Sequence, residues 1–131
     1  MESHNKKNYY DLTKGMKPHL NVLKFLDLNI PPHKAIDLGC GAGRDTIALL
    51  KNEWEVLSID KENTEHIIIE NLASNELKKF TFKQSLFGEM NLPQVDLIVA
   101  NFSLPFSKKD KFNLIWKKIV DSILIERILC R

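Results

Sequence analysis

The sequence predicts an α/β fold built on a doubly wound, mostly parallel sheet. Short apolar segments alternate along the chain with segments of helical periodicity, and the apolar segments are too uniformly hydrophobic to have a face in water. A cluster of three glycines, Gly39, Gly41 and Gly43, lies where the first of these strands meets the helix that follows it. Ligands bind at the carboxyl ends of the strands in such sheets, so this junction is the expected site.

Length and composition favour a single domain over residues 1–131, with N-terminal helices at about 9–28 and a core at about 33–125. The net charge of +2 comes from scattered lysines and nearly as many acids, so we expect no nucleic-acid partner. No apolar run approaches the roughly 18 residues that a membrane helix needs, and we expect no membrane association. Cys40 and Cys130 are far apart, which favours a reduced cytoplasmic protein over a disulfide framework.

Within 9–28, apolar residues recur at helical spacing and predict one or two helices, which the prolines at 31–32 end. The short apolar segment 34–39 predicts the first strand. Residues 44–52 predict a helix. The residues expected on the apolar face of that helix are Ile47, Ala48 and Leu50.

The alternation then repeats twice along the chain. We expect a strand at 54–60, a helix at 63–77 and strands at 79–86 and 95–102. A last amphipathic helix is expected at 107–123. Trp116 shares its apolar stripe, which favours a place in the core.

Glycine meets two needs of a loop between a strand and a helix. It adopts positive backbone dihedrals, and it lets a ligand approach the backbone closely. The helix that begins near Arg44 presents free amides and the positive end of its dipole, so we expect a carboxylate or phosphate group of a ligand to bind there. A tight turn with close helix packing is the structural alternative. A dinucleotide fingerprint would require a small residue where this chain has Arg44, which disfavours a nicotinamide-dependent enzyme.

Residues 35–46, AIDLGCGAGRDT, and 54–62, WEVLSIDKE, closely resemble the first two motifs of class I S-adenosylmethionine-dependent methyltransferases. The chain looks most like a small bacterial branch that includes the tellurite-resistance methyltransferases, whose members share a Gly-Cys-Gly-x-Gly-Arg start. Residues 95–106, VDLIVANFSLPF, resemble that branch's fourth motif, and the resemblance runs from about residue 9 to 122. It implies a Rossmann-like fold, S-adenosyl-L-methionine as cofactor, and methyl transfer to a small-molecule acceptor by in-line displacement.

Asp60 ends the second strand, where an acid can accept hydrogen bonds from both ribose hydroxyls; a solvated acid or a helix cap is the alternative. By the resemblance, Asp37 helps to position the amino end of the methionine, directly or through water, and Arg44 faces its carboxylate. The remaining contacts of that loop are expected from Gly39, Cys40, Gly41 and Gly43.

Other positions depart from the family pattern or are ambiguous. Lys61 stands where the family often places an apolar residue against the adenine, so its stem covers the ring only partly. Ser85 or backbone groups replace the acid that usually meets the adenine amine. Asn101 and Phe102 are expected to face the transferred methyl group, and an N-terminal segment with Tyr9 and Tyr10 either folds over the cofactor or simply packs.

The sequence names no catalytic residue and no metal site. Displacement at a sulfonium needs a general base only for an acceptor that carries a proton, and no convincing base stands out. His19, His33 and His66 have no metal-ligand spacing with Cys40 or Cys130.

The tail differs from the family pattern, because no glycine or proline follows Pro105 to introduce a further strand. We therefore expect a C-terminally incomplete sheet without its last strands, as a shifted reading frame or an early stop would produce. Residues 123–130 either continue the last helix or form an edge strand, and the uncovered edge favours a homodimer. Three functional interpretations follow: an active methyltransferase, a cofactor-binding but inactive module, and a poorly folded fragment.

Overall fold

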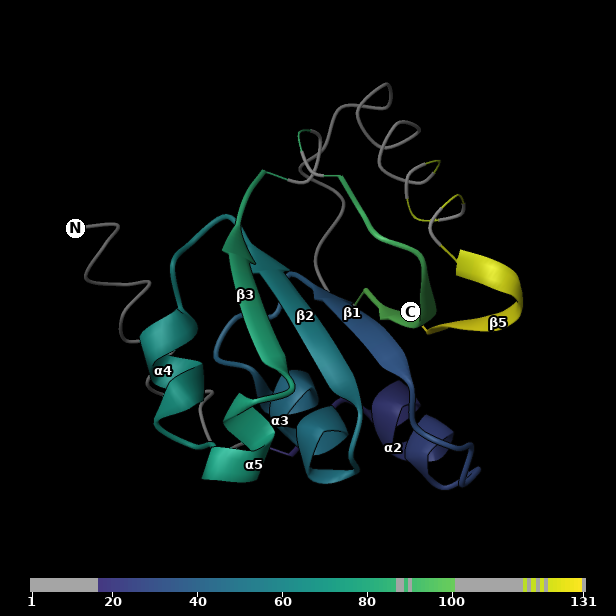
Figure 1. Cartoon of the computed structure of the whole chain (residues 1–131), viewed down its shortest axis with the longest axis horizontal. Helices are drawn as coiled ribbons and strands as arrows, with labels where there is room; N and C mark the ends of the chain where they lie inside the picture. Colours follow the sequence, from purple (N-terminus) through teal and green to yellow (C-terminus); the bar gives the residue numbers. More distant parts are fainter. Residues whose placement is uncertain are drawn as a thin grey trace.

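The structure is a computed structural model that describes residues 17–86, 89, 91–100, 117, 119 and 121, together with the backbone of 123–130. Its strands form one five-stranded sheet in the order β3-β2-β1-β4-β5, and every pairing is parallel (Figure 1). The strands are β1 (Lys34–Leu38), β2 (Glu55–Asp60), β3 (Phe80–Gln84), β4 (Val95–Val99) and β5 (Ile123–Cys130). The predicted α/β class with a mostly parallel sheet is confirmed, and the strand order reverses at β1, where a ligand site is expected.

The helices whose bounds lie within the described residues are α2 (Leu20–Leu26), α3 (Arg44–Lys51), α4 (Glu65–Ile69) and α5 (Ser74–Leu77), and residues 117, 119 and 121 are also helical. Figure 1 shows α2 and α3 on the same side of the sheet. The prediction of a single helix over 63–77 is wrong, because this segment contains two short helices. The backbone is extended at Ala73, and the Glu76 carboxylate accepts a hydrogen bond from the Ala73 amide at 2.8 Å, which starts α5 as a separate helix.

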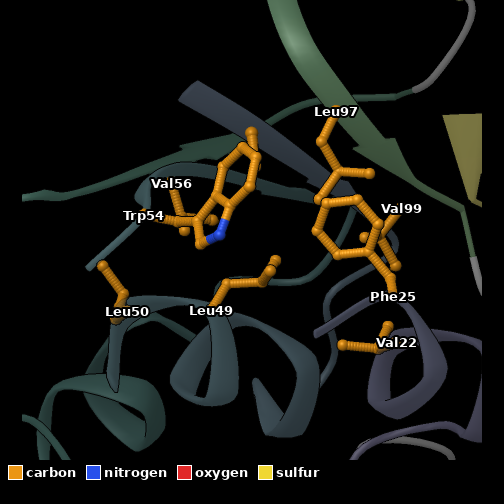
Figure 2. Packing of buried hydrophobic residues seen from close by; sticks show 9 residues of the cluster. Val22, Phe25, Leu49, Leu50, Trp54, Val56, Leu97 and Val99 are labelled. Atoms are coloured by element: carbon orange, nitrogen blue, oxygen red, sulfur yellow. The ribbon is translucent and has the colours of Figure 1, made fainter. Parts of the chain in front are cut away.

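A large apolar cluster fills the space between the sheet and the helices α2 and α3 (Figure 2). Phe25 of α2 meets Trp54 edge to face, with ring centroids 5.5 Å apart, which packs α2 against the segment between α3 and β2. The buried members of the cluster are Val22, Phe25, Ala35, Leu49, Leu50, Trp54, Val56, Leu97 and Val99.

A second apolar cluster covers the other face of the sheet. Successive β1 residues alternate between the clusters, with Ala35 in the first and Ile36 in the second. Ile119, which is helical, packs into the second cluster and is 2% exposed. The central strands are therefore buried on both faces, as a doubly wound sheet requires. The buried members of this cluster are Ile36, Leu38, Ile59, Val95, Ile98 and Ile119.

The buried face of α3 differs from the apolar face that the sequence predicts. Leu50 is buried as expected, but Ile47 and Ala48 are only half-buried, while Asp45 and Thr46 are fully covered. Both polar side chains have hydrogen-bond partners on neighbouring elements, which makes their burial tolerable. The helix thus turns two polar groups toward the sheet and α2.

The segment after the last predicted helix forms a strand. Strand β5 pairs with β4 in parallel, with Ile123 opposite Val95 and Cys130 opposite Val99, and the register shifts between Val95 and Leu97. Of the two alternatives for this segment, the structure has the edge strand. The predicted helices before α2 and the greater part of the one at 107–123, including Trp116, lie outside the described residues.

Candidate functional site

The loop that joins β1 to α3 has an unusual backbone. Gly39, Gly41 and Gly43 have φ angles of 70°, 54° and 87°, in the left-handed region that residues with a Cβ rarely adopt. Three such residues in five positions turn the chain sharply from the carboxyl end of β1 into α3. The glycine cluster is therefore a geometric requirement of this loop.

Asp60, at the carboxyl end of β2, lies directly beside this loop. Its Oδ2 accepts a hydrogen bond from the Gly41 amide at 2.9 Å, and its Oδ1 accepts one from the Glu62 amide at 2.9 Å. The residue is 7% exposed, and its carbonyl oxygen accepts a further bond from the Ser85 amide. Each carboxylate oxygen can accept a second hydrogen bond, so the group remains an acceptor for a ligand.

The amides of the loop divide into two groups. Those of Gly39 and Cys40 donate to the carbonyl oxygen of Ile59, which fastens the loop to β2. Among the residues that the structure describes, no protein acceptor is found for the amides of Ala42 and Arg44. These amides lie at the amino end of α3, where the helix dipole favours an anionic partner.

A buried polar network lies under the loop. Thr46 donates a hydrogen bond to Asp37 Oδ2 at 2.6 Å, and its hydroxyl lies 2.6 Å from that of Ser58. The pKa of Asp37 is raised from 3.8 to about 8, chiefly by burial and also by the nearby carboxylates of Asp45 and Asp60, against the opposing effect of the Thr46 hydrogen bond. Asp37 is therefore a neutral acid at pH 7, and its 2% exposure favours a supporting or water-mediated role over direct contact.

The other side of the loop packs against α4 and the residue that precedes it. The Cys40 thiol lies 3.9 Å from the Thr64 hydroxyl, and burial raises the pKa of this thiol well above its usual value. Cys40 is thus a neutral, buried side chain with none of the character of a nucleophile. A Cβ at Gly43 would lie 2.5 Å from Cγ1 of Ile68, so this glycine also permits the close approach of α4.

His19 is a residue of this region whose place the sequence analysis missed. It precedes α2, yet its amide and its Nδ1 both contact the Asp45 carboxylate in the first turn of α3, and its Nε2 contacts the Arg44 guanidinium. The partners are 25 and 26 residues away along the chain. No local sequence pattern signals such a contact.

The remaining predicted residues are more peripheral in the structure. Lys61 is exposed beyond the end of β2, and its carbonyl oxygen accepts a bond from the Gln84 side chain. Ser85 is half-buried, and its hydroxyl donates to the carbonyl oxygen of Leu86. The four aromatic and amide positions predicted over the cofactor lie outside the described residues, namely Tyr9, Tyr10, Asn101 and Phe102.

A pocket of about 200 Å³ lies at the opposite end of the sheet, lined in part by residues 29–32 and 52–54, which precede β1 and β2. It is separate from the glycine loop. The described residues contain no group of three histidine, cysteine or acidic side chains placed to hold a metal ion. A search of the same residues for a long apolar helix that could cross a bilayer finds none.

The family model of tellurite resistance protein TehB matches residues 2–124 of this chain. Among solved structures, a TehB-like SAM-dependent methyltransferase from Corynebacterium glutamicum has a TM-score of 0.66 at 20% identity, over 92% of this chain and 66% of that one. The glycopeptide N-methyltransferase MtfA, complexed with S-adenosyl-L-methionine, has a TM-score of 0.73 at 13% identity, over 88% of this chain and 49% of that one. The DhpI-SAM-HEP complex has a TM-score of 0.68 at 17% identity, over 95% of this chain and 59% of that one.

At these identities the structural likeness shows a shared fold, which is the one that the sequence motifs imply. The chain spans between about half and two thirds of the length of these three structures. A search of curated proteins by sequence finds no match to this chain.

Proposed function

Because the chain belongs to the family of tellurite resistance protein TehB, we propose that it binds S-adenosyl-L-methionine and transfers a methyl group from it to a small-molecule acceptor. The observation that carries this proposal is the contact between the positive-φ glycine loop and Asp60 at the carboxyl edge of the sheet. The solved structure of similar fold that contains S-adenosyl-L-methionine also supports it.

The residues present fit the chemical groups of this cofactor. We propose that the two ribose hydroxyls donate hydrogen bonds to the Asp60 carboxylate, each of whose oxygens can accept one bond more than the structure shows. We assign the cofactor's carboxylate to the Arg44 guanidinium and to the amides of Ala42 and Arg44, which have no protein acceptor among the described residues. The adenine would lie near the stem of Lys61 and near Ser85, which follow the ends of β2 and β3. Asp37 would support the loop from below.

When bound, the cofactor supplies an electrophilic methyl group on a positively charged sulfur. The protein's contribution is then to hold donor and acceptor in line and to exclude water, and such alignment is worth about 7–11 kcal/mol in favourable cases. From the family resemblance, the proposal assigns Asn101 and Phe102 to the side of the methyl group. It includes no general base, so the acceptor it favours is a small molecule that is already anionic or deprotonated.

An alternative within the same family is a module that binds the cofactor and transfers no methyl group. The chain spans 49% of the length of MtfA, so methyl transfer by this chain is a separate question from cofactor binding. Binding with turnover supports the enzyme, and binding without turnover supports the module. A chain that stays loosely packed in the presence of ligand would favour the third interpretation, a poorly folded fragment.

Calorimetric titration with S-adenosylmethionine and S-adenosylhomocysteine tests the cofactor site. Wild-type protein is expected to bind both, and Asp60→Ala to weaken binding at least about a hundredfold, since two hydrogen bonds to a charged group are lost. Asp60→Asn is a second variant of similar shape that cannot accept from both hydroxyls. The control is Asp27→Ala, which removes an exposed acid after α2. Folded wild-type protein that binds neither ligand would contradict the proposal.

Two further sequence predictions, a cytoplasmic location and a homodimer, stay proposals. Strand β5 lies at the edge of the five-stranded sheet, and an unpaired strand edge is a place where a second chain can add. Sedimentation velocity tests the dimer: a monomer at micromolar concentrations would contradict it.

A further inference from the structure

The contacts of His19 connect the start of α2 to the first turn of α3. The His19 amide donates to Asp45 Oδ1 at 2.8 Å, and Nδ1 of its ring lies 2.6 Å from Asp45 Oδ2. The Asp45 side chain is 5% exposed and that of His19 is 34% exposed, so the carboxylate is buried while the ring is partly open to water. On its other side, Nε2 of the ring contacts the guanidinium of Arg44.

The partners determine which nitrogen of the ring carries the proton. A guanidinium has only donors, so Nε2 of His19 must accept the hydrogen bond from Arg44. Nδ1 then carries the proton and donates it to the Asp45 carboxylate. Asp45 thus fixes the orientation of the ring with Nε2 turned toward Arg44.

The contact with His19 helps to explain why Arg44 lies in the first turn of α3. An arginine in the first turn of a helix opposes the helix dipole, so the dipole does not account for its place. The guanidinium of Arg44 contacts His19 through one nitrogen. Its other N–H groups can donate a pair of parallel hydrogen bonds to a carboxylate. Arg44 follows Gly43 directly, at the end of the loop assigned to the cofactor.

We propose that His19 is a positioning residue, which holds the Arg44 guanidinium beside the glycine loop so that it can bind the carboxylate of the cofactor's amino-acid part. The inference rests on the proposed function and deepens it. On this inference, the side chains of His19, Arg44 and Asp45 together make the protein prefer ligands that carry the carboxylate over ligands that lack it.

Two ligands separate this role from a merely structural one. S-adenosylhomocysteine carries the carboxylate, whereas 5′-methylthioadenosine keeps the adenosine and the sulfur and lacks the amino-acid part. A positioning role predicts that changes at His19 weaken binding of the first ligand and leave that of the second unchanged. General damage to the site would weaken both.

Two substitutions divide the functions of the ring. His19→Asn places an amide near the position of Nδ1, so it keeps a donor for Asp45 and loses the acceptor for Arg44. His19→Gln places a carbonyl oxygen near the position of Nε2 and keeps that acceptor. We expect His19→Asn to raise the dissociation constant for S-adenosylhomocysteine at least about fivefold, as loss of one charge-assisted contact implies, and His19→Gln to restore most of it. His33→Asn, at an exposed histidine before β1, is the control.

The measurement is calorimetric titration of each variant with both ligands, after a thermal melt shows that it is folded. Arg44→Ala should reduce the affinity for S-adenosylhomocysteine about tenfold or more, and adding His19→Asn to it should have no further effect. If His19→Asn does not fold, Asp45→Asn, which replaces the carboxylate that orients the ring, makes the same comparison between the two ligands. Equal losses for both ligands, or unchanged affinities, would overturn the inference and leave the proposed function intact. Wild-type protein that binds neither ligand would overturn both.

Discussion

The Gly41 amide and the Asp60 carboxylate form a hydrogen bond of 2.9 Å that joins two loops 19 residues apart in the sequence. The same carboxylate accepts the Glu62 amide, so one side chain orders both the turn after β1 and the turn after β2. These turns lie at the carboxyl ends of neighbouring parallel strands. The two turns are thus held together by hydrogen bonds within the protein itself.

This dual role predicts a cost in stability as well as in binding. Asp60→Ala leaves two backbone amides without their charged acceptor, and we expect it to lower the free energy of unfolding by about 2–4 kcal/mol. Asp60→Asn keeps one acceptor oxygen and should lose less. Urea denaturation followed by circular dichroism measures both. An alanine variant as stable as wild type would show that the bond does not order the loops.

The acidic network under the loop predicts a dependence of stability on pH. The pKa of Asp37 is about 8 in the folded chain, against an ordinary value of 3.8 that applies in the unfolded chain. Between these two pH values the folded state therefore binds more protons than the unfolded state. Stability from this group is complete below about pH 4 and decreases as the pH rises to about 8, by at most about 1.4 kcal/mol per unit. Asp37→Asn mimics the neutral acid and should remove this slope.

Urea denaturation of wild type and Asp37→Asn at several pH values between 5 and 9 checks this expectation. The variant should gain stability relative to wild type as the pH rises. A difference that is constant with pH would mean that folding does not raise the pKa of Asp37.

Packing against α4 predicts that Gly43 tolerates no side chain. Gly43→Ala places a Cβ on a residue with φ of 87° and 2.5 Å from Ile68, so we expect a loss of about 2–4 kcal/mol. Ile68→Ala removes the clash and costs stability itself, because Ile68 is fully buried. In a double-mutant cycle the two losses should therefore be less than additive. Additive losses would mean that Gly43→Ala destabilises the protein only through its positive φ angle and not through the contact with Ile68.

The end of α3 predicts a stabilising substitution. After α3, the amide of Glu53 donates to the carbonyl oxygen of Leu50, and that of Trp54 to the carbonyl oxygen of Leu49. Helices often end in this way, with one residue in the left-handed conformation. Here that residue is Glu53, whose φ is 71°. Glu53→Gly should raise the free energy of unfolding by about 0.5–1 kcal/mol, whereas Glu53→Ala keeps the strain and should not. Thermal melts of the two variants compare them, and equal effects would contradict the expectation.

The parts of the fold that the sequence could predict are those with local signals. The alternation of apolar and periodic segments located the first four strands and α3, and the glycines with Asp60 located the loop. The break between α4 and α5 was missed, because apolar residues such as Ile69 and Leu72 continue the helical pattern across it. The turn depends instead on one contact, from Glu76 to the Ala73 amide.

The side chains that support the site could not be predicted for a different reason. Asp45 and Thr46 look like surface residues at the start of a helix, and they are buried only because His19, Asp37 and Ser58 come from elsewhere to pair with them. Tertiary contacts of this kind leave no periodicity in the chain. Likewise, the glycines looked like a ligand loop, while the close contact of Gly43 with Ile68 appears only in three dimensions.

The cofactor site is tested most directly by an amide spectrum of ¹⁵N-labelled protein during titration with S-adenosylhomocysteine. A site at the glycine loop predicts that the resonances of Gly39, Gly41 and Gly43 and of Asp60 shift together and saturate at one affinity. The amide resonances of Asn29 and Ile30 and of residues 52–54, around the pocket at the other end of the sheet, should not move. Shifts confined to those two segments, or none in a folded protein, would contradict a cofactor site at the glycine loop.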